Sequence, residues 1–510
     1  MSAVASIDGR APGAKYRGLI TLSVMLASIM QALDTTIANV ALPRIQGSLS
    51  ATQDQMVWVL TSYIVAAAIM TPLSGWLAGQ IGRKRVFLFS VAGFTVASAL
   101  CGLAESLPQV VAARLLQGIC GAALIPMSQA VLLDINPPER HAKAMAMWVM
   151  AISAGPILGP ALGGWLTENY NWRWVFYINA PFGLLSFLGI LAFMAETEPH
   201  KSRFDFFGFT ALSAAIGAFQ LLLDRGQQQD WFSSTEIWVE CVVAGVALYL
   251  FVVHMLTTTK APFVSPALFK DRNFLTGNVF IFIVGVVLFA TLALLPPLLQ
   301  GPMNYPVILT GLVMVPRGIG TLAATYLVGR LAGKIDTRVV IAIGFGLTAL
   351  SLWQMTGFYL QMGSMSIVWS GVIQGVGIGL VYAPLGAIAF ATLAPRFRDE
   401  GTAFFSLVRN LGSSVGISAV QTLLTRNSQT LHSQLGGQVT PFSDLLHLHA
   451  ATSTPAGLAA LNASVSAQAA MIAYNDDFKL MMLLALCAVP LVALLSRSRP
   501  GKDAGSGVME

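Results

Sequence analysis

Residues 75–85 of this sequence read GWLAGQIGRKR. A related stretch, GRLAGKIDTR, occupies residues 329–338, at an offset of 254 residues. Each stretch follows a long apolar run and ends in basic residues, so each reads as a short polar turn between two apolar helices. The recurrence suggests an internal repeat.

Two other features return at nearly the same offset. Gln117 recurs as Gln374, 257 residues later, and Arg140 recurs as Arg398, 258 residues later. The nearly constant offset predicts two copies of one structural unit that run in the same direction, as in many membrane carriers.

The composition around these repeats is that of a membrane protein. Of the 510 residues, 55% are hydrophobic and 10% are charged, and the mean hydropathy is +0.70. Ordinary soluble domains carry roughly 25% charged residues. The composition excludes a soluble protein with a single core and an intrinsically disordered chain. Long continuous apolar runs also differ from the alternating strands of a membrane barrel.

Apolar runs bounded by charges, proline or glycine predict fourteen transmembrane helices. The predicted spans are 18–42, 56–78, 86–104, 109–132, 142–166, 175–195, 206–223, 236–256, 274–299, 307–329, 339–360, 366–391, 401–424 and 478–496. We therefore expect an all-α membrane protein with both termini on the same side.

The repeat divides these spans into two six-helix halves with two helices inserted between them. We assign residues 1–200 to the first half, 201–260 to the inserted pair and 261–510 to the second half. The longest segment outside the membrane, 425–477, is rich in Ser, Thr, Gln and Ala and is predicted to be a periplasmic loop with at most a short surface helix.

The basic residues predict the orientation. With a cytoplasmic N-terminus, 21 of the 29 Lys and Arg residues fall on the inside and 5 on the outside. The remaining three, Arg114, Arg317 and Arg409, lie inside predicted spans. Since cytoplasmic loops are enriched in Lys and Arg, both termini are expected in the cytoplasm.

Residues 75–88 resemble the signature loop between helices 2 and 3 of the major facilitator superfamily, and the resemblance extends over nearly the whole chain. It implies the major facilitator fold. Gly79 stands where that family usually has an acid. We therefore expect Asp134, at the inner end of the fourth span, to pair with Arg83 or Arg85.

Five other stretches indicate which group within this family the chain resembles. RLLQG, residues 114–118, resembles the helix 4 arginine motif, and GPILGPALGG, residues 155–164, is similar to a helix 5 motif that marks exporters working as antiporters. LDTTIANVALP, residues 33–43, is similar to the helix 1 motif of fourteen-helix drug:proton antiporters. LDRG and DWFSS, residues 223–226 and 230–234, resemble the EmrB-like subfamily of Gram-negative bacteria.

This resemblance implies proton-coupled efflux of drugs and toxic compounds by alternating access across the bacterial inner membrane. Small hydrophobic drugs, protons and the lipid bilayer are the expected partners. A periplasmic adaptor (EmrA-like) and an outer-membrane channel (TolC-like) are further partners that the resemblance implies. The alternative is a proton-coupled importer or exporter of one specific metabolite.

Asp34 is the only acid deep inside any predicted span. A carboxylate at that depth is costly unless it is paired, hydrated or protonated, and it can therefore exchange a proton near neutral pH. Asp34 and Arg114 lie at similar depths, roughly 12 Å and 9 Å from the outer ends of their helices. We predict that Arg114 pairs with Asp34 and controls its proton affinity; a fixed structural ion pair is the alternative.

Arg317 and Arg409 lie near the midplane of the second half, roughly 15 Å from their helix ends. No acid inside the predicted spans of that half neutralises them. Because arginine stays charged, such residues face water or an anion. We predict that they form, with Asn39, Gln117 and Asn410, a substrate cavity that accepts acidic amphiphiles. Binding to helix carbonyls or lipid headgroups is the alternative.

Gly155, Gly159 and Gly163 share one helix face, where small residues let a neighbouring helix approach closely. Pro156 and Pro160 each remove a backbone donor and bend the helix. This face is therefore predicted to be a packing surface and a hinge. The signature loop, with Gly75, Arg83 and Asp134, is the candidate inner gate.

The sequence contains few motifs that would indicate another class of protein. It lacks the nucleotide-binding pattern of a pump. Residues 412–416 fit Gly-x-Ser-x-Gly but lie within a predicted helix, whereas that motif needs a strand-turn-helix context, so no enzyme is expected. No cofactor and no nucleic-acid partner are expected. His447 and His449 are not expected to bind a metal, and the four cysteines lie in apolar runs as core residues.

Overall fold

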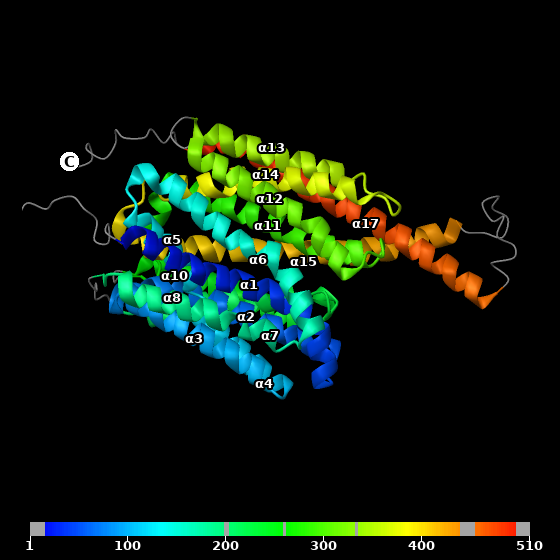
Figure 1. Cartoon of the computed structure of the whole chain (residues 1–510), viewed down its shortest axis with the longest axis horizontal. Coiled ribbons are helices and arrows are strands. Elements are labelled where there is room, and N and C mark those ends of the chain that lie inside the picture. The colour runs from blue at the N-terminus through cyan, green and yellow to red at the C-terminus, as the bar shows by residue number, and fades with distance from the viewer. Residues whose placement is uncertain (1–15, 198–202, 259–261, 332–334, 439–453, 496–510) are drawn as a thin grey trace, which may run out of the picture.

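The computed structural model describes residues 16–197, 203–258, 262–331, 335–438 and 454–495. These residues form long, roughly parallel helices, and no strand occurs among them (Figure 1). An apolar chain in a membrane must satisfy its backbone hydrogen bonds within each segment, and helices do so.

The first helices form one bundle, which we call the N bundle. Its helices are α1 (Arg17–Leu49), α2 (Gln53–Ile81), α3 (Arg83–Leu103), α4 (Leu107–Gly121), α5 (Leu124–Ile135), α6 (His141–Asn169), α7 (Trp174–Tyr177) and α8 (Asn179–Phe193). The signature loop contracts to Gly82, which separates α2 from α3 at φ +94°. Only glycine adopts that conformation without strain, so the loop residue type is explained by the turn.

The last helices form the C bundle. Its helices are α11 (Arg272–Gln300), α12 (Val307–Leu331), α13 (Thr337–Met355), α14 (Ser364–Ala389), α15 (Arg398–Gln438) and α17 (Pro455–Leu491). Short 3₁₀ turns precede two of them, Pro266–Lys270 before α11 and Pro395–Phe397 before α15.

The two bundles meet along α2 against α15 and α6 against α12. α5 also contacts α15, and α14 contacts α6. The division of the chain into halves with borders near residues 200 and 260 stays a prediction, and both borders fall outside the described residues.

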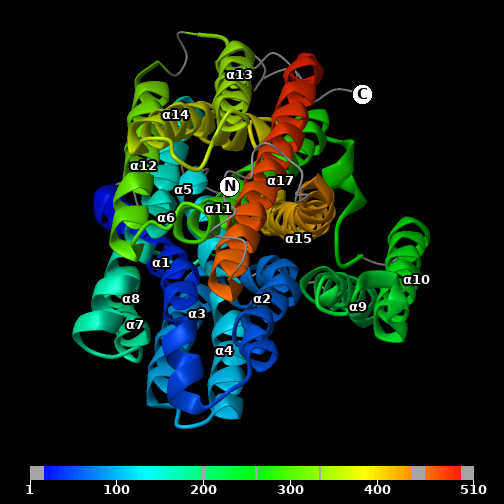
Figure 2. The same cartoon turned by 90° about the vertical axis from the view of Figure 1, so that its right-hand side faces the viewer.

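The inserted helices are α9 (Phe206–Arg225) and α10 (Thr235–Thr257). α9 packs against both α2 and α15, so it lies along the junction between the bundles. α10 packs on α9 at one edge of the molecule (Figure 2). Most of its surface is apolar and exposed, which suits contact with lipid.

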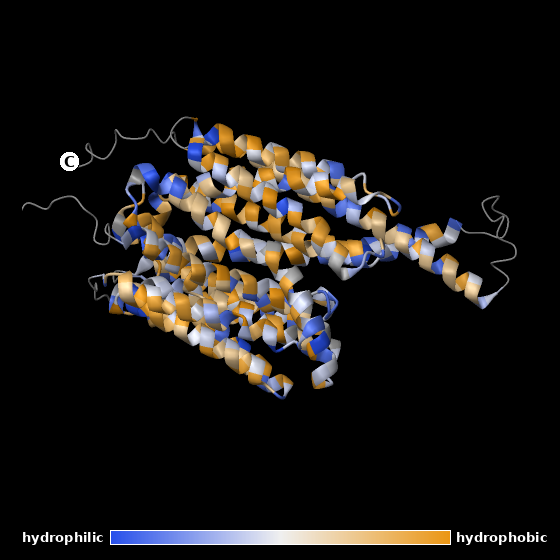
Figure 3. Cartoon of the chain, viewed as in Figure 1, coloured by the Kyte–Doolittle hydropathy of each residue, from blue (hydrophilic) through white to orange (hydrophobic). Residues whose placement is uncertain are grey.

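The chain crosses the membrane many times. Thirteen helical segments of the described residues are long and apolar enough to span a bilayer. α6, a further helix of 29 residues, takes the place of the predicted fifth span. Apolar residues cover the sides of the molecule and hydrophilic ones gather at its two ends (Figure 3). The total of fourteen spans and their orientation remain predictions.

The prediction that residues 425–477 form a loop with at most a short surface helix is wrong. α15 continues to Gln438 and α17 already begins at Pro455, so most of the segment is helical. Figure 1 shows both helices projecting beyond the other ends. Hydropathy marks where the apolar run ends, whereas Ala, Leu and Gln sustain a helix in water.

Candidate functional site

Asp34 lies at the centre of a buried hydrogen-bond network in the N bundle. Its side chain is 1% exposed and lies 2.7 Å from Arg114 Nη1. The second carboxylate oxygen accepts hydrogen bonds from Gln117 Nε2 at 2.8 Å and Asn179 Nδ2 at 2.7 Å. The pairing with Arg114 predicted from helix depth is therefore present.

Arg114 is also held on its other sides. Its Nε donates to the carbonyl of Val59 at 3.1 Å, and Nη1 donates to Gln117 Oε1 at 2.6 Å. The guanidinium lies 4.3 Å from the centre of the Tyr63 ring. α1, α2 and α4 thus position the cation, and the ion pair is satisfied on both sides, as burial in a membrane protein requires.

Asn179 is a member of this network that sequence reasoning missed. It lies at the start of α8 and also donates to Ser98 Oγ at 2.9 Å. An amide inside an otherwise apolar span was the available signal. Gln117, predicted to line the substrate cavity, belongs to the Asp34 network, while Asn39 is exposed on α1.

The two arginines of the C bundle differ in their partners. Arg317 is buried, and neither terminal nitrogen of its guanidinium has a hydrogen-bond partner among the described residues. Arg409 is buried too, but it donates to the Tyr382 hydroxyl at 2.8 Å and to Asn410 Oδ1 at 3.2 Å. Arg317 therefore presents a buried positive charge that lacks a counterion among the described residues.

A second buried acid lies in the C bundle. Asp477, placed by the sequence just outside the last span, is 1% exposed inside α17. Neither of its carboxylate oxygens has a hydrogen-bond partner among the described residues. Asp477 lies near the end of the C bundle, because Asn475 donates to the Phe358 carbonyl in the turn between α13 and α14. Asp34 therefore remains the only acid deep inside a predicted span.

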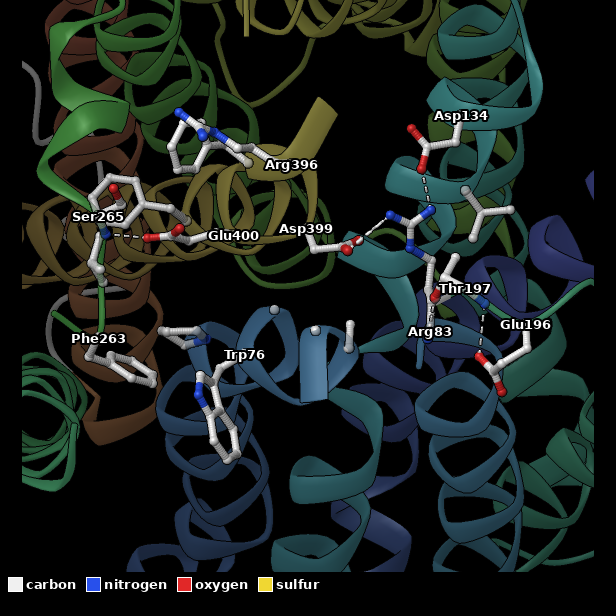
Figure 4. A pocket seen from close by; sticks show the side chains of 18 of the residues that line it. Trp76, Arg83, Asp134, Glu196, Thr197, Phe263, Ser265, Arg396, Asp399 and Glu400 are labelled. Atoms are coloured by element: carbon white, nitrogen blue, oxygen red, sulfur yellow. Dashed lines mark hydrogen bonds and ion pairs between the residues drawn. The ribbon is translucent and has the colours of Figure 1, made fainter. Parts of the chain in front are cut away.

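Ion pairs join the two bundles at the end of the molecule that holds the signature loop, which we call the basic side. Arg83 pairs with Asp134 of α5 and, at 2.8 Å, with Asp399 of α15 (Figure 4). Arg398 of α15 pairs with Asp134 in the other direction. The expected partner Asp134 is thus shared between Arg83 and a C-bundle arginine. The C-bundle acid Asp399 was not foreseen.

Gly75 explains why these charges can meet. A β-carbon at this position would lie 3.0 Å from the Asp399 carbonyl oxygen, so α2 and the start of α15 are in close contact there. Glycine in a membrane helix permits such an approach. The first residue of the signature loop therefore positions the interbundle ion pairs.

A cavity of about 1160 Å³ lies beside these ion pairs on the basic side. Among the described residues, its lining includes Gly75, Arg83 and Asp134, but none of the five residues predicted for the substrate cavity. Figure 4 shows Glu400 of α15 reaching Ser265, and the Glu400 carboxylate accepts a hydrogen bond from the backbone N–H of Ser265.

Asp205 borders the same cavity just before α9. Burial alone would raise its pKa, but hydrogen bonds from the backbone N–H groups of Gly208 and Phe263 and from His254 outweigh that effect. The pKa of Asp205 is therefore lowered. Its carboxylate joins the start of α9 to the chain that enters the C bundle.

The glycine face of α6 packs against α1. A β-carbon on Gly155 would collide with the backbone carbonyl of Ala32, and one on Gly159 with the Thr36 hydroxyl. The predicted close packing is therefore confirmed at these two positions. α6 continues through Pro156 and Pro160, whose side chains lie outside the described part of the chain, as do His447 and His449.

Comparison with known proteins agrees with this architecture. The profile of the Major Facilitator Superfamily matches residues 24–417. The fatty acid resistance protein FarB of Neisseria gonorrhoeae is 37% identical over 496 residues, covering 96% of this chain and 97% of its own length. The multidrug export protein EmrB of Escherichia coli K12 is 38% identical over 428 residues, covering 83% of each chain.

Two solved structures share the fold. The human organic anion transporter MFSD10 has a TM-score of 0.61 and 14% identity, covering 92% of this chain and 99% of its own. The proton:xylose symporter XylE has a TM-score of 0.59 and 13% identity, covering 95% of this chain and 100% of its own. The chain therefore belongs to the major facilitator superfamily, within its EmrB-like group.

Proposed function

We propose that this protein exports hydrophobic and acidic amphiphiles across the bacterial inner membrane in exchange for protons. The observation that carries the proposal is the fully buried carboxylate of Asp34, held by Arg114 and two amides. The multidrug export named for the EmrB relatives supports the same activity.

Asp34 is the proposed proton site. When the carboxylate takes up a proton, its attraction to Arg114 weakens, and the guanidinium is left with less charge compensation. A substrate that binds at this network would compete with the proton. Two states with different protonation are what exchange of drug for proton requires.

The interbundle ion pairs are the proposed inner gate. Alternating access needs the bundles to separate on the basic side, and separation would break the contacts of Asp134 and Asp399 with arginines of the opposite bundle. The close packing of Gly155 and Gly159 against α1 would hold the N bundle rigid during this motion. The signature loop thus acts as a charge latch in which Asp399 supplies the carboxylate that is missing at Gly79.

Arg317 and Arg409 give the proposed preference for acidic substrates. An unpartnered buried guanidinium is stabilised by a carboxylate or other anion, because charge-assisted hydrogen bonds replace lost hydration. The relative FarB is named for fatty acid resistance, and fatty acids are acidic amphiphiles. Asn410, which accepts from Arg409, and Asn39 and Gln117 complete the proposed substrate path.

The projecting ends of α15 and α17 are the proposed contact with a periplasmic adaptor that leads to an outer-membrane channel. The described residues 427–438 and 455–475 contain no Asp, Glu, Lys or Arg. His432 and Asn462 join the two helices at 3.0 Å. An uncharged helical pair rich in Ala suits close packing against helices of another protein.

Transport in inside-out membrane vesicles tests the proposed function. With an acidic interior, an exporter should accumulate an acidic amphiphile such as labelled decanoate, and an uncoupler should abolish the accumulation. Accumulation of one metabolite in right-side-out vesicles instead, with no drug movement, would identify the alternative metabolite importer and reject drug export.

Removing the C-bundle arginines is expected to change selectivity. Arg317→Ala and Arg409→Ala should each reduce decanoate export by roughly tenfold, because each loses one charge-assisted contact to the anion. Export of decyltrimethylammonium, a cation of the same chain length, should be nearly unchanged. Transport rates for both compounds measure this, and equal losses for the anion and the cation would contradict an anion site.

A further inference from the structure

Two aromatic rings meet across the junction of the bundles. Trp148 of α6 stacks on Tyr382 of α14, with ring centres 6.1 Å apart and an interplanar angle of 18°. Both side chains are almost completely buried. Each lies about 10 Å from the basic-side end of its helix, whereas Arg409 lies about 16 Å from the start of α15. The ring pair therefore lies between Arg409 and the basic side.

Hydrogen bonds hold each ring on its own bundle. In the N bundle, Trp148 Nε1 donates to Ser128 Oγ at 2.8 Å, and that oxygen also accepts from Ser28 Oγ at 2.7 Å. In the C bundle, the Tyr382 hydroxyl accepts from Arg409 Nη1 at 2.8 Å. One continuous contact thus runs from α1 through α5, α6 and α14 to the buried arginine of α15.

We propose that Tyr382 competes with the anionic substrate for Arg409, and that Trp148 holds Tyr382 in the competing position only while the basic side is closed. The inference rests on the proposed anion site. Trp148 and Tyr382 belong to different bundles, so separation on the basic side removes the stack. The Tyr382 ring is then free to turn, and Arg409 becomes available to an anion.

This arrangement makes the affinity of Arg409 for the anion depend on which side of the protein is open. Arg409 binds the anion when the basic side is open, since a carboxylate is a stronger acceptor than a phenol oxygen. Closure brings Trp148 back onto Tyr382, and the phenol oxygen displaces the anion toward the other side. By reciprocity, an anion bound to Arg409 favours the open basic side. Tyr382 is a specificity-determining residue and Trp148 is its positioning residue.

Binding of decanoate to the full-length protein in lipid nanodiscs tests the competition. Tyr382→Phe keeps the stacked ring and removes the oxygen, so decanoate should bind about tenfold more tightly. Binding of decyltrimethylammonium should stay the same. Trp148→Phe should shift decanoate affinity in the same direction. Tyr359→Phe is the matched control, because Tyr359 is 59% exposed in the same bundle and should leave both affinities unchanged.

The same binding experiment distinguishes failure of the anion site at Arg409 from failure of the competition by Tyr382. If Arg409→Ala loses decanoate binding but Tyr382→Phe binds it with wild-type affinity, the competition is rejected and the anion site stands. If Arg409→Ala binds decanoate normally, the anion site and the competition are both rejected.

Distances between spin labels test the coupling to the gate. Labels at Glu139→Cys and Arg396→Cys, exposed positions of the two bundles on the basic side, would be compared in a background without the four native cysteines. Decanoate should lengthen the distance in the wild type, and Tyr382→Phe should show the longer distance without any ligand. A wild-type distance that decanoate binding does not change would overturn the coupling.

Discussion

Asp34→Asn is expected to abolish drug-dependent proton flux. Asparagine keeps the size of the side chain and one acceptor oxygen, so it can accept either from Arg114 or from the two amides, but it cannot take up and release a proton. Reconstituted vesicles containing this variant should show the proton flux of empty vesicles when a drug gradient is imposed. Binding of drug should survive, because proton coupling and not the site itself is removed.

The matched control is Asp230→Asn. Asp230 is exposed and has φ +53°, a conformation that asparagine also adopts readily, so this change of the same chemical kind should leave coupling intact. Thermal unfolding of both variants in detergent separates loss of coupling from loss of folding, since breaking a buried ion pair costs about 3–5 kcal/mol. Wild-type coupling in a folded Asp34→Asn protein would refute the role given to Asp34.

Helix depth was enough to predict the Asp34–Arg114 pair. Both residues are costly in a membrane, and only one partner of opposite charge lies at a matching depth in the same half. The amide of Asn179 could not be predicted in the same way, because a neutral side chain leaves no charge to balance. Its place depends on how α8 rotates toward α1, which hydropathy does not report.

Contacts between the bundles were the hardest to predict. The sequence offers Asp134 as a partner for Arg83, but the pairing of Arg83 with Asp399 and the stack of Trp148 on Tyr382 join residues more than 200 positions apart. Such contacts also depend on which side of the protein is closed. A pattern along the chain describes helices and their faces, whereas interbundle contacts belong to one conformation.

The ends of several helices were also predicted inaccurately. Spans were placed by apolar content, so the start of α17 and its buried Asp477 were missed, and the fourth span divides into α4 and α5 near Ala122. Hydrogen bonding decides where a helix begins and ends, and it continues into polar segments such as the ends of α15 and α17.

The second large effect is expected at Gly155, because a backbone atom opposes it. Gly155→Ala would press a methyl group against the Ala32 carbonyl and force α1 and α6 apart, whereas Gly164→Ala, with nothing within 4 Å, is the control on the same helix. Gly155→Ala should cost about 1–3 kcal/mol or more of stability and slow transport, since overpacked helices cannot relax without moving.

A parallel change at Gly159 distinguishes a clash with a side chain from a clash with the backbone. Its β-carbon would meet the Thr36 side chain and not the backbone, so Gly159→Ala should be rescued in part by Thr36→Ala, although Thr36 also donates to the Gly155 carbonyl at 3.0 Å. Gly155→Ala should not be rescued by the same change. Melting temperatures and transport rates of the single and double variants measure this cycle. If Gly155→Ala proves as stable and as active as Gly164→Ala, close packing of α6 on α1 has no part in transport, and the rigid N bundle proposed for alternating access must be abandoned.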